Sequence, residues 1–328
     1  MKKKSYKIYS LNENEIIEKY LKKLNFNKNE SYDFENDSAF LRTYKNHKII
    51  VTNDSIIENV DFFKNDNPQS IAQKIITYNL SDLSAMGAIP YSYTLNLCIP
   101  KYLTIDWFKK FVNHLFKLQK KYNFFLLGGD LSQSNKIIIS SNFFGYVSKD
   151  KILKRTGSKI HDDIWVTGNI GESLVGLKIK QKKIKINNLV KKYFLNKYLY
   201  PVHCPLGHKI SNYVTSSIDI SDGFYGDLSK LINFKNYGAS LNIDHIPLSG
   251  QTKNLIKNKK ITLDSLLSSG DDYELIFTAN SKKSSIIKRI SKKNNIKITK
   301  VGKIISKKGI YLDNKKIKII NKSFEHFS

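Results

Sequence analysis

The chain has 328 residues, of which 41% are hydrophobic, and this length exceeds the ~250–300 residues at which a single core stops growing, so we expect two α/β lobes. Its formal charge of +27 would ordinarily indicate a nucleic-acid or acidic membrane partner. Only Arg42, Arg155 and Arg289 are arginine, however, whereas nucleic-acid recognition favours arginine forks with interleaved aromatics, so we expect a solvated basic surface and neither partner.

The first elements are an amphipathic helix and two strands. Ser10 and Glu13 have the spacing of a capping box, and apolar residues at helical spacing follow over residues 16–24. Strand-like runs follow at residues 39–44 and 48–52.

The second strand ends at Asn53 and Asp54, which we expect in a turn that presents an acid. A helix then opens at Asn67 with a cap and a first-turn proline, and it runs to about Met86 before a glycine stops it. Asp82 lies near the C-terminal end of this helix.

The remaining elements alternate between strands and helices. In the first lobe we expect strands at 93–98, 124–127 and 136–147 and a helix at 104–122. A charged stretch at 148–151 without apolar periodicity marks the domain boundary, so residues 1–148 form a mixed-sheet N-terminal lobe and residues 149–328 an α/β C-terminal lobe. In the second lobe we expect strands at 163–167, 216–220, 239–243, 273–278, 297–304 and 309–312, and helices at 171–179, 187–198, 205–213, 224–232 and 282–293.

The two cysteines, Cys98 and Cys204, have no metal-ligand or redox spacing, which predicts no disulfide and a reduced, cytoplasmic setting. The basic start of the chain is followed by polar residues, so we do not expect a secretory signal. No stretch reaches the ~18 apolar residues of a spanning helix.

Acidic side chains recur at the edges of the expected elements, with no positive side chain beside them. Magnesium takes one or two carboxylates together with water and phosphate oxygens, so scattered single acids suit a phosphate-transfer site. A lone aspartate at a strand end is more often a cap or a turn residue, so the prediction depends on the whole set. The set is Asp37, Asp54, Asp82, Asp130, Asp219 and Asp222.

Residues 219–223 leave a buried strand and enter a helix, which places Asp222 near the positive helix end, where phosphate also binds. A plain N-cap explains Asp222 but not Asp219 or Gly223. The turn at residues 168–171 also joins a strand to a helix and is a weaker candidate for facing an anion. A Walker-type loop, a Ser-His-Asp arrangement and zinc-ligand spacing are all absent from the sequence.

The order of these motifs resembles that of the thiamine-monophosphate kinase family, within the aminoimidazole ribonucleotide synthetase superfamily. The resemblance spans about residues 15–327. The family fold has two α/β lobes, and its N-terminal lobes pair in a homodimer. The matching segments are residues 79–88, 128–130, 153–157, 163–171, 219–223 and 269–275.

This resemblance implies ATP-dependent phosphorylation of thiamine monophosphate to thiamine diphosphate with several magnesium ions. The implied magnesium ligands are Asp37, Thr52, Asn53, Asp54, Asp82, Asp130, Asp219 and Asp222. The implied ATP contacts are Gly129, Asp130, Arg155 and Ser221, and the implied thiamine-phosphate contacts are Asp61, Asp271 and Phe324. Of these, Asp130, Arg155 and Asp222 are the implied catalytic residues, while Phe324 has an alternative role in packing the tail onto the core.

The chain departs from the family pattern at four places. It has Glu35-Asn36-Asp37 where Gly-Asp-Asp is usual, Asp61 in place of a histidine, and Asp271 in place of a glutamate. The usual arginine after Gly-Gly-Asp is missing around Gln133. We expect these changes to alter metal and substrate affinity more than the activity itself.

Two other readings stay open. A sister enzyme of the aminoimidazole ribonucleotide synthetase type would act on a ribonucleotide, and residues 269–275 favour the thiamine branch over it. A non-catalytic basic nucleic-acid-binding protein would have no need of the acids that persist at Asp82, Asp130, Asp219 and Asp222.

Overall fold

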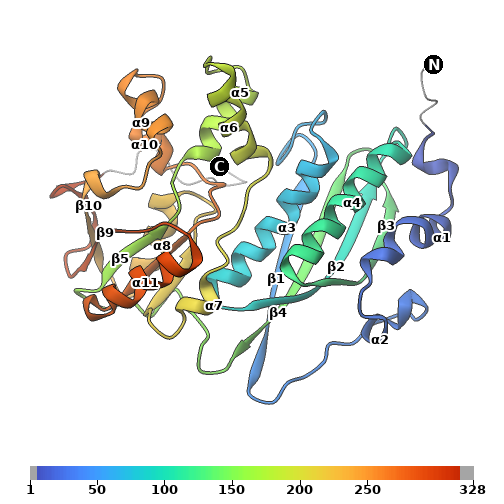
Figure 1. Ribbon diagram of the computed structural model, residues 1–328, viewed down its shortest axis with the longest axis horizontal. Helices are drawn as coiled ribbons and strands as arrows, with labels where there is room; N and C mark the ends of the chain where they lie inside the picture. Colours follow the sequence, from blue (N-terminus) through green and yellow to red (C-terminus); the bar gives the residue numbers. More distant parts are fainter. Residues whose placement is uncertain (1–5, 318–328) are drawn as a thin grey trace. The chain divides into compact units, whose positions relative to one another are not determined.

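The computed structural model describes residues 6–317, which form two compact units (Figure 1). Within the described residues, unit 1 comprises residues 6–83 and 89–149, and unit 2 comprises residues 84–88 and 150–317. Both units mix helices with mixed β-sheets, which confirms the predicted fold class. Within the described part, no helix is long and apolar enough to cross a bilayer.

Unit 1 is built on a four-stranded sheet in the order β1-β4-β2-β3, in which only the β2–β3 pair is parallel. Its strands are β1 (His47–Ile57), β2 (Ile89–Ile99), β3 (Phe125–Gln133) and β4 (Ile138–Ser148). Its helices are α1 (Glu13–Ile16), α2 (Lys28–Ser31), α3 (Pro68–Ala85) and α4 (Ile105–Tyr122).

Two long helices, α3 and α4, lie side by side in unit 1 and are linked by a 3.0 Å hydrogen bond between Gln73 and His114 (Figure 1). The α4 sequence is strongly amphipathic, and Thr104 caps its first turn by accepting from the Trp107 backbone N–H. From Ile49 onward, exposed residues alternate with partly buried or buried residues, which gives β1 one covered and one accessible face. This alternation determines which acidic side chains lie on the same face of the sheet.

Several predicted boundaries in unit 1 were wrong. The capping box is formed by Asn12 and Glu15, because the Ser10 hydroxyl bonds to the Lys7 carbonyl instead. The helix it begins is only four residues long before it passes into π and 3-10 turns. Residues 39–44 form no strand, and β1 continues past the expected turn to Ile57.

Unit 2 is built on a seven-stranded sheet in the order β11-β10-β7-β9-β5-β8-β6. Its strands are β5 (Asp163–Thr167), β6 (Ser216–Asp219), β7 (Gly238–Leu241), β8 (Leu275–Ala279), β9 (Ile298–Ile305), β10 (Gly309–Leu312) and β11 (Lys315–Lys316). Its helices are α5 (Glu172–Lys180), α6 (Asn188–Leu199), α7 (Gly207–Ile210), α8 (Phe224–Asn233), α9 (Gly250–Lys257), α10 (Leu263–Leu267) and α11 (Ser284–Asn294).

The interior strand β5 is buried on both faces, as expected for a sheet covered by helices on each side. Ile164 and Val166 belong to the cluster that includes the apolar face of α8. Trp165 points the other way and packs with Phe277 and with residues of α7 and α11. The loop at residues 220–223 joins the end of β6 to the start of α8. It belongs to the segment that the sequence predicts to lie near phosphate.

Candidate active site

In unit 1, three acids gather on one side of β1. The Thr52 hydroxyl donates a 2.5 Å hydrogen bond to Oδ2 of Asp82 on α3. Asp54 lies two residues further along the same face, and its Oδ2 is buried without a hydrogen-bond partner. Burial, and then the charges of Asp82 and Asp61, raise the pKa of Asp54 to about 7. Like-charged carboxylates with a bare oxygen are the arrangement that a divalent cation relieves, so these residues fit magnesium.

Asp61 lies beside this group, in the turn after β1. Its Oδ2 accepts a 2.7 Å hydrogen bond from the Ile57 backbone N–H. The ammonium of Lys74 on α3 donates a 2.8 Å bond to the Asp61 carbonyl oxygen. The residue implied as a substrate contact is therefore a neighbour of the predicted metal ligands.

The remaining predicted ligands of unit 1 lie on the other face of the sheet. Asn53 points away from Asp54 and donates a 2.6 Å hydrogen bond to Asn142, which in turn donates to the Thr94 hydroxyl. Thr94 lines a cavity of about 440 Å³ together with Asp37 and Asp130.

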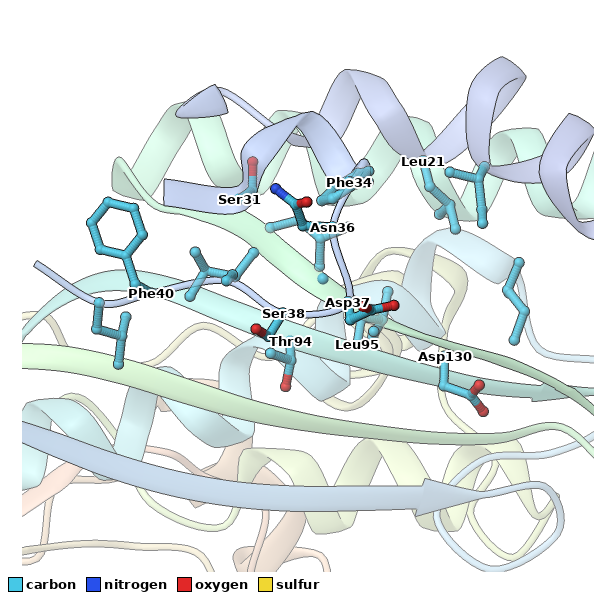
Figure 2. A pocket seen from close by; sticks show the side chains of 18 of the residues that line it. Leu21, Ser31, Phe34, Asn36, Asp37, Ser38, Phe40, Thr94, Leu95 and Asp130 are labelled. Atoms are coloured by element: carbon cyan, nitrogen blue, oxygen red, sulfur yellow. The ribbon is translucent and has the colours of Figure 1, made fainter. Parts of the chain in front are cut away.

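Figure 2 shows this cavity, with Asp37 on the loop after α2 and Asp130 on β3. Both carboxylates are exposed, and the Ser132 hydroxyl donates a 2.6 Å hydrogen bond to Asp130. Gly129 lines the same cavity. Residues 128–130 lie within β3 rather than after it, because the parallel pairing with β2 continues to Gln133.

The unit 1 ligands thus form two groups on opposite faces of the sheet and not one cage. No group of three or more acidic, histidine or cysteine side chains that could hold a metal by themselves occurs within residues 6–317. Magnesium requires few protein oxygens when phosphate supplies others, so this scattered arrangement is consistent with a metal–nucleotide site.

In unit 2, Asp219 is buried at the end of β6, and Ser221 and Asp222 form the turn into α8. Gly223 is the N-cap with φ 117°, a backbone conformation that favours glycine, so the N-cap role considered for Asp222 was wrong. The Asp222 carboxylate pairs instead with the Lys230 ammonium. The expectation that no cation stands beside these acids was therefore wrong here.

The turn is organised by two residues that the sequence reading missed. Asp227, one turn into α8, accepts from the backbone N–H groups of Ser221 and Asp222 at 3.1 and 3.0 Å. Its other oxygen receives a 2.8 Å bond from Lys230. Asp227 and Lys230 lie five and eight residues after Asp222, and their i,i+3 spacing on a helix was the sequence signal that could have identified this pair.

The segment at residues 269–275 packs directly on this turn. The Asp271 backbone N–H donates a 3.0 Å bond to the Ser221 carbonyl, and the Tyr273 N–H donates a 2.9 Å bond to the Ile220 carbonyl. The Asp271 carboxylate receives a 2.6 Å bond from the Tyr273 hydroxyl. Two motifs separated by about fifty residues in sequence therefore form one wall of unit 2.

The turn at residues 168–171 faces carboxyl groups of the protein itself. The Gly171 N–H donates a 2.7 Å hydrogen bond to Asp272, whose pKa is raised well above its ordinary value by burial. Glu172 follows in the first turn of α5 and is also buried. Carboxyl groups of the protein thus occupy the positive helix end, which disfavours binding of a further anion there.

Arg155 is exposed in a turn whose neighbours pack on the start of β6, where the Ser217 N–H donates a 3.0 Å bond to the Lys154 carbonyl. Phe324 lies outside the described residues.

Comparison with known proteins places this geometry in a family. Residues 35–147 match the N-terminal domain, and residues 159–314 the C-terminal domain, of AIR synthase related protein. Thiamine-monophosphate kinase of Buchnera aphidicola subsp. Schizaphis graminum (strain Sg) is 37% identical over 324 residues, which cover 96% of this chain and 99% of the relative. The chain belongs to the thiamine-monophosphate kinase family.

Solved structures of this family have the same fold. Thiamine-monophosphate kinase from Stenotrophomonas maltophilia K279a has a TM-score of 0.80 and 28% identity, over 86% of this chain and 90% of that one. AaThiL complexed with AMPPCP and TMP has a TM-score of 0.78 and 25% identity, over 98% of both chains. The resemblance to the thiamine-monophosphate kinase family inferred from motif order is confirmed.

Proposed function

We propose that the protein transfers the γ-phosphoryl group of ATP to thiamine monophosphate and so produces thiamine diphosphate. The observation that carries this proposal is the acid group of unit 1, where Thr52 and Asp82 join β1 to α3 beside the bare buried oxygen of Asp54. Membership of the thiamine-monophosphate kinase family supports the substrate, and the AaThiL complex with AMPPCP, an analogue of ATP, supports the co-substrate.

The chemistry needs no general base from the protein. The nucleophile is a phosphate oxygen, and a phosphate monoester has a second pKa of ~6, so it is already anionic at neutral pH. The barrier is the approach of two polyanions, and positioning with charge neutralisation lowers it. This matches a proposed site whose described residues are mostly carboxylates.

Each predicted residue has a role in this proposal. The magnesium ligands are Asp37, Thr52, Asn53, Asp54, Asp82, Asp130, Asp219 and Asp222, and bound magnesium neutralises phosphate charge and orients the transferred group. Gly129, Asp130, Arg155 and Ser221 contact ATP, and Arg155 adds a positive charge at the phosphates. Asp61, Asp271 and Phe324 contact thiamine monophosphate, with Asp130, Arg155 and Asp222 closest to the chemistry.

We further propose a homodimer formed through unit 1. The accessible face of its sheet carries exposed apolar side chains on β1 and β2, including Val51, which is 58% exposed, and Ile89, which is 55% exposed. Apolar groups in such a position favour burial by another surface.

Cys98 and Cys204 are both free, which suits a reducing cytoplasm.

The test is product formation with purified protein, ATP and magnesium across a panel of acceptors. We expect thiamine diphosphate from thiamine monophosphate, and no product from thiamine or from aminoimidazole precursors. Chromatography of the quenched reactions measures each product. Turnover of an aminoimidazole precursor would assign the protein to the sister branch, and tight, salt-sensitive DNA binding without any phosphate transfer would contradict an enzymatic role.

A further inference from the structure

The loop at residues 32–41 carries Asp37 and forms one wall of the unit 1 cavity. Figure 2 shows Phe34, Asn36, Asp37 and Phe40 of this loop lining the cavity together with Asp130 of β3. We call it the Asp37 loop. Asp37 is itself exposed, so its position relative to Asp130 depends on how the loop is held.

The backbone of the Asp37 loop begins in an unfavourable conformation. Tyr32, Asp33 and Phe34 have φ values of 50°, 55° and 65°, and none of them is glycine. Three consecutive left-handed residues with side chains are uncommon, and such conformations persist only where surrounding contacts hold them. The loop must therefore be fixed at its ends.

Glu30 provides that anchor at the start of the loop. Its side chain is 0% exposed, and its Oε1 accepts a 2.5 Å hydrogen bond from the Tyr91 hydroxyl on β2 and a 3.1 Å bond from Asn27. Its backbone carbonyl accepts a 3.0 Å bond from the Phe40 N–H. Burial, and then Glu30 itself, raise the pKa of Tyr91, so this hydroxyl keeps the proton that it donates.

Arg42 closes the other end of the loop. Its Nε lies 3.5 Å from Oε1 of Glu30, and its carbonyl oxygen accepts a hydrogen bond from the Tyr146 hydroxyl on β4. The rings of Tyr91 and Tyr146 pack edge to face with centroids 4.8 Å apart. Glu30, Arg42, Tyr91 and Tyr146 thus form one clamp that ties both ends of the loop to two neighbouring strands.

We propose that Glu30 is a positioning residue, whose clamp with Tyr91 and Arg42 holds the Asp37 loop so that Asp37 and Asp130 share a divalent cation. The inference rests on the proposed function for the role of Asp37. In this loop Glu35-Asn36-Asp37 stands where the family usually has Gly-Asp-Asp, so Asp37 is the single aspartate of the motif. The clamp fixes the loop that carries it.

The test uses Tyr91→Phe, which removes one hydroxyl, and Glu30→Gln, which keeps the shape of the side chain. Glu18→Gln is the matched control, because Glu18 makes an exposed 3.0 Å pair with Lys22 in the same unit. Mn²⁺ binding in the presence of AMPPCP is measured by electron paramagnetic resonance, without turnover, and a thermal midpoint is recorded for each variant.

We expect Tyr91→Phe and Glu30→Gln to weaken Mn²⁺ binding by about tenfold or more, because loss of a group that orients a metal ligand typically costs about 10–100-fold in metal affinity. Glu18→Gln should leave it unchanged. In an Asp37→Asn background, Tyr91→Phe should cause no further loss, because the ligand it positions is gone.

Three results would overturn the inference: clamp variants that lower only the thermal midpoint, an equal loss in the Asp37→Asn background, or a wild-type protein that binds no Mn²⁺. Should Glu30→Gln fail to fold, Tyr91→Phe and Arg42→Lys decide the question. Failure of the proposed function is distinguishable, since it would abolish thiamine diphosphate formation while the metal-binding differences persisted.

Discussion

The ammonium of Lys230 pairs with the carboxylate of Asp222, the residue that the family resemblance implies as a magnesium ligand. The same ammonium bonds Asp227, which fixes the turn from beneath by accepting from two backbone N–H groups. Lys230 therefore neutralises the charge of Asp222 and Asp227 and stabilises the turn at residues 221–223.

We predict that Lys230→Met lowers the thermal midpoint of the protein, because it leaves the buried Asp227 carboxylate without its charged partner. A loss of about 1–3 kcal/mol is expected for such a group. Differential scanning fluorimetry measures the change, with the exposed α11 residue Lys288→Met as control. An unchanged midpoint in Lys230→Met would show that the pair does not organise the turn.

Asp54 predicts a specific pH dependence for the metal-free protein. Its pKa of about 7 lies above the ordinary aspartate value, so the folded state binds this proton more tightly than the unfolded chain does. Its contribution to stability is therefore lost as pH rises from about 4, and the penalty is complete above about pH 7.

Asp54→Asn removes this penalty. Without metal, the variant should melt at a higher temperature than wild type near pH 8, and the two should converge only below about pH 4, where Asp54 is protonated in both the folded and the unfolded state. Thermal melts in chelator across this range make the comparison. Asp106→Asn serves as control, since Asp106 forms an exposed pair with Lys110. A constant difference at every pH would contradict the raised pKa.

The adjacent glycines of β3 should respond differently to substitution. A Cβ on Gly129 would lie 1.9 Å from the Leu95 carbonyl oxygen, so Gly129→Ala must separate β2 from β3. A Cβ on Gly128 meets nothing within 4 Å, which makes Gly128→Ala the matched control. We expect Gly129→Ala to cost about 2 kcal/mol or more of unfolding free energy, measured by denaturant titration, and Gly128→Ala to cost little. Equal losses would argue against the close approach.

Asp130→Asn should reduce kcat for thiamine diphosphate formation by about a hundredfold or more, because it removes the charge that holds a cation at the transferred phosphate. Its carboxylate is exposed, and the Ser132 hydroxyl that bonds it is retained, so the fold should survive. Steady-state kinetics with a circular dichroism spectrum as fold control measure the effect. Activity within a few fold of wild type would remove Asp130 from the reaction.

The sequence predicted local features whose signals are contiguous. The helix α3 was expected from Asn67 to about Met86 and runs over Pro68–Ala85, because a cap, a proline and a terminal glycine all mark it. The sequence placed Asp54 and Asp130 just after their strands, but both lie within them. The length of β1 is set by its pairing with β4 and that of β3 by its pairing with β2, and no local sequence pattern indicates either pairing.

The partners of the predicted site residues were the least accessible to sequence reasoning. The motif at residues 219–223 was identified, but its contact with Asp271 depends on how the strands of unit 2 are ordered. The separation of Asn53 from Asp54 by the sheet follows from strand alternation once both are placed within β1.

The most direct test of the central claim follows the phosphorus atoms by ³¹P nuclear magnetic resonance in a reaction of the protein with ATP, magnesium and thiamine monophosphate. Loss of the γ-phosphorus signal of ATP should be matched by equal amounts of ADP and of a new diphosphate ester on thiamine. Release of the γ-phosphate as free inorganic phosphate, with thiamine monophosphate unchanged, would contradict it.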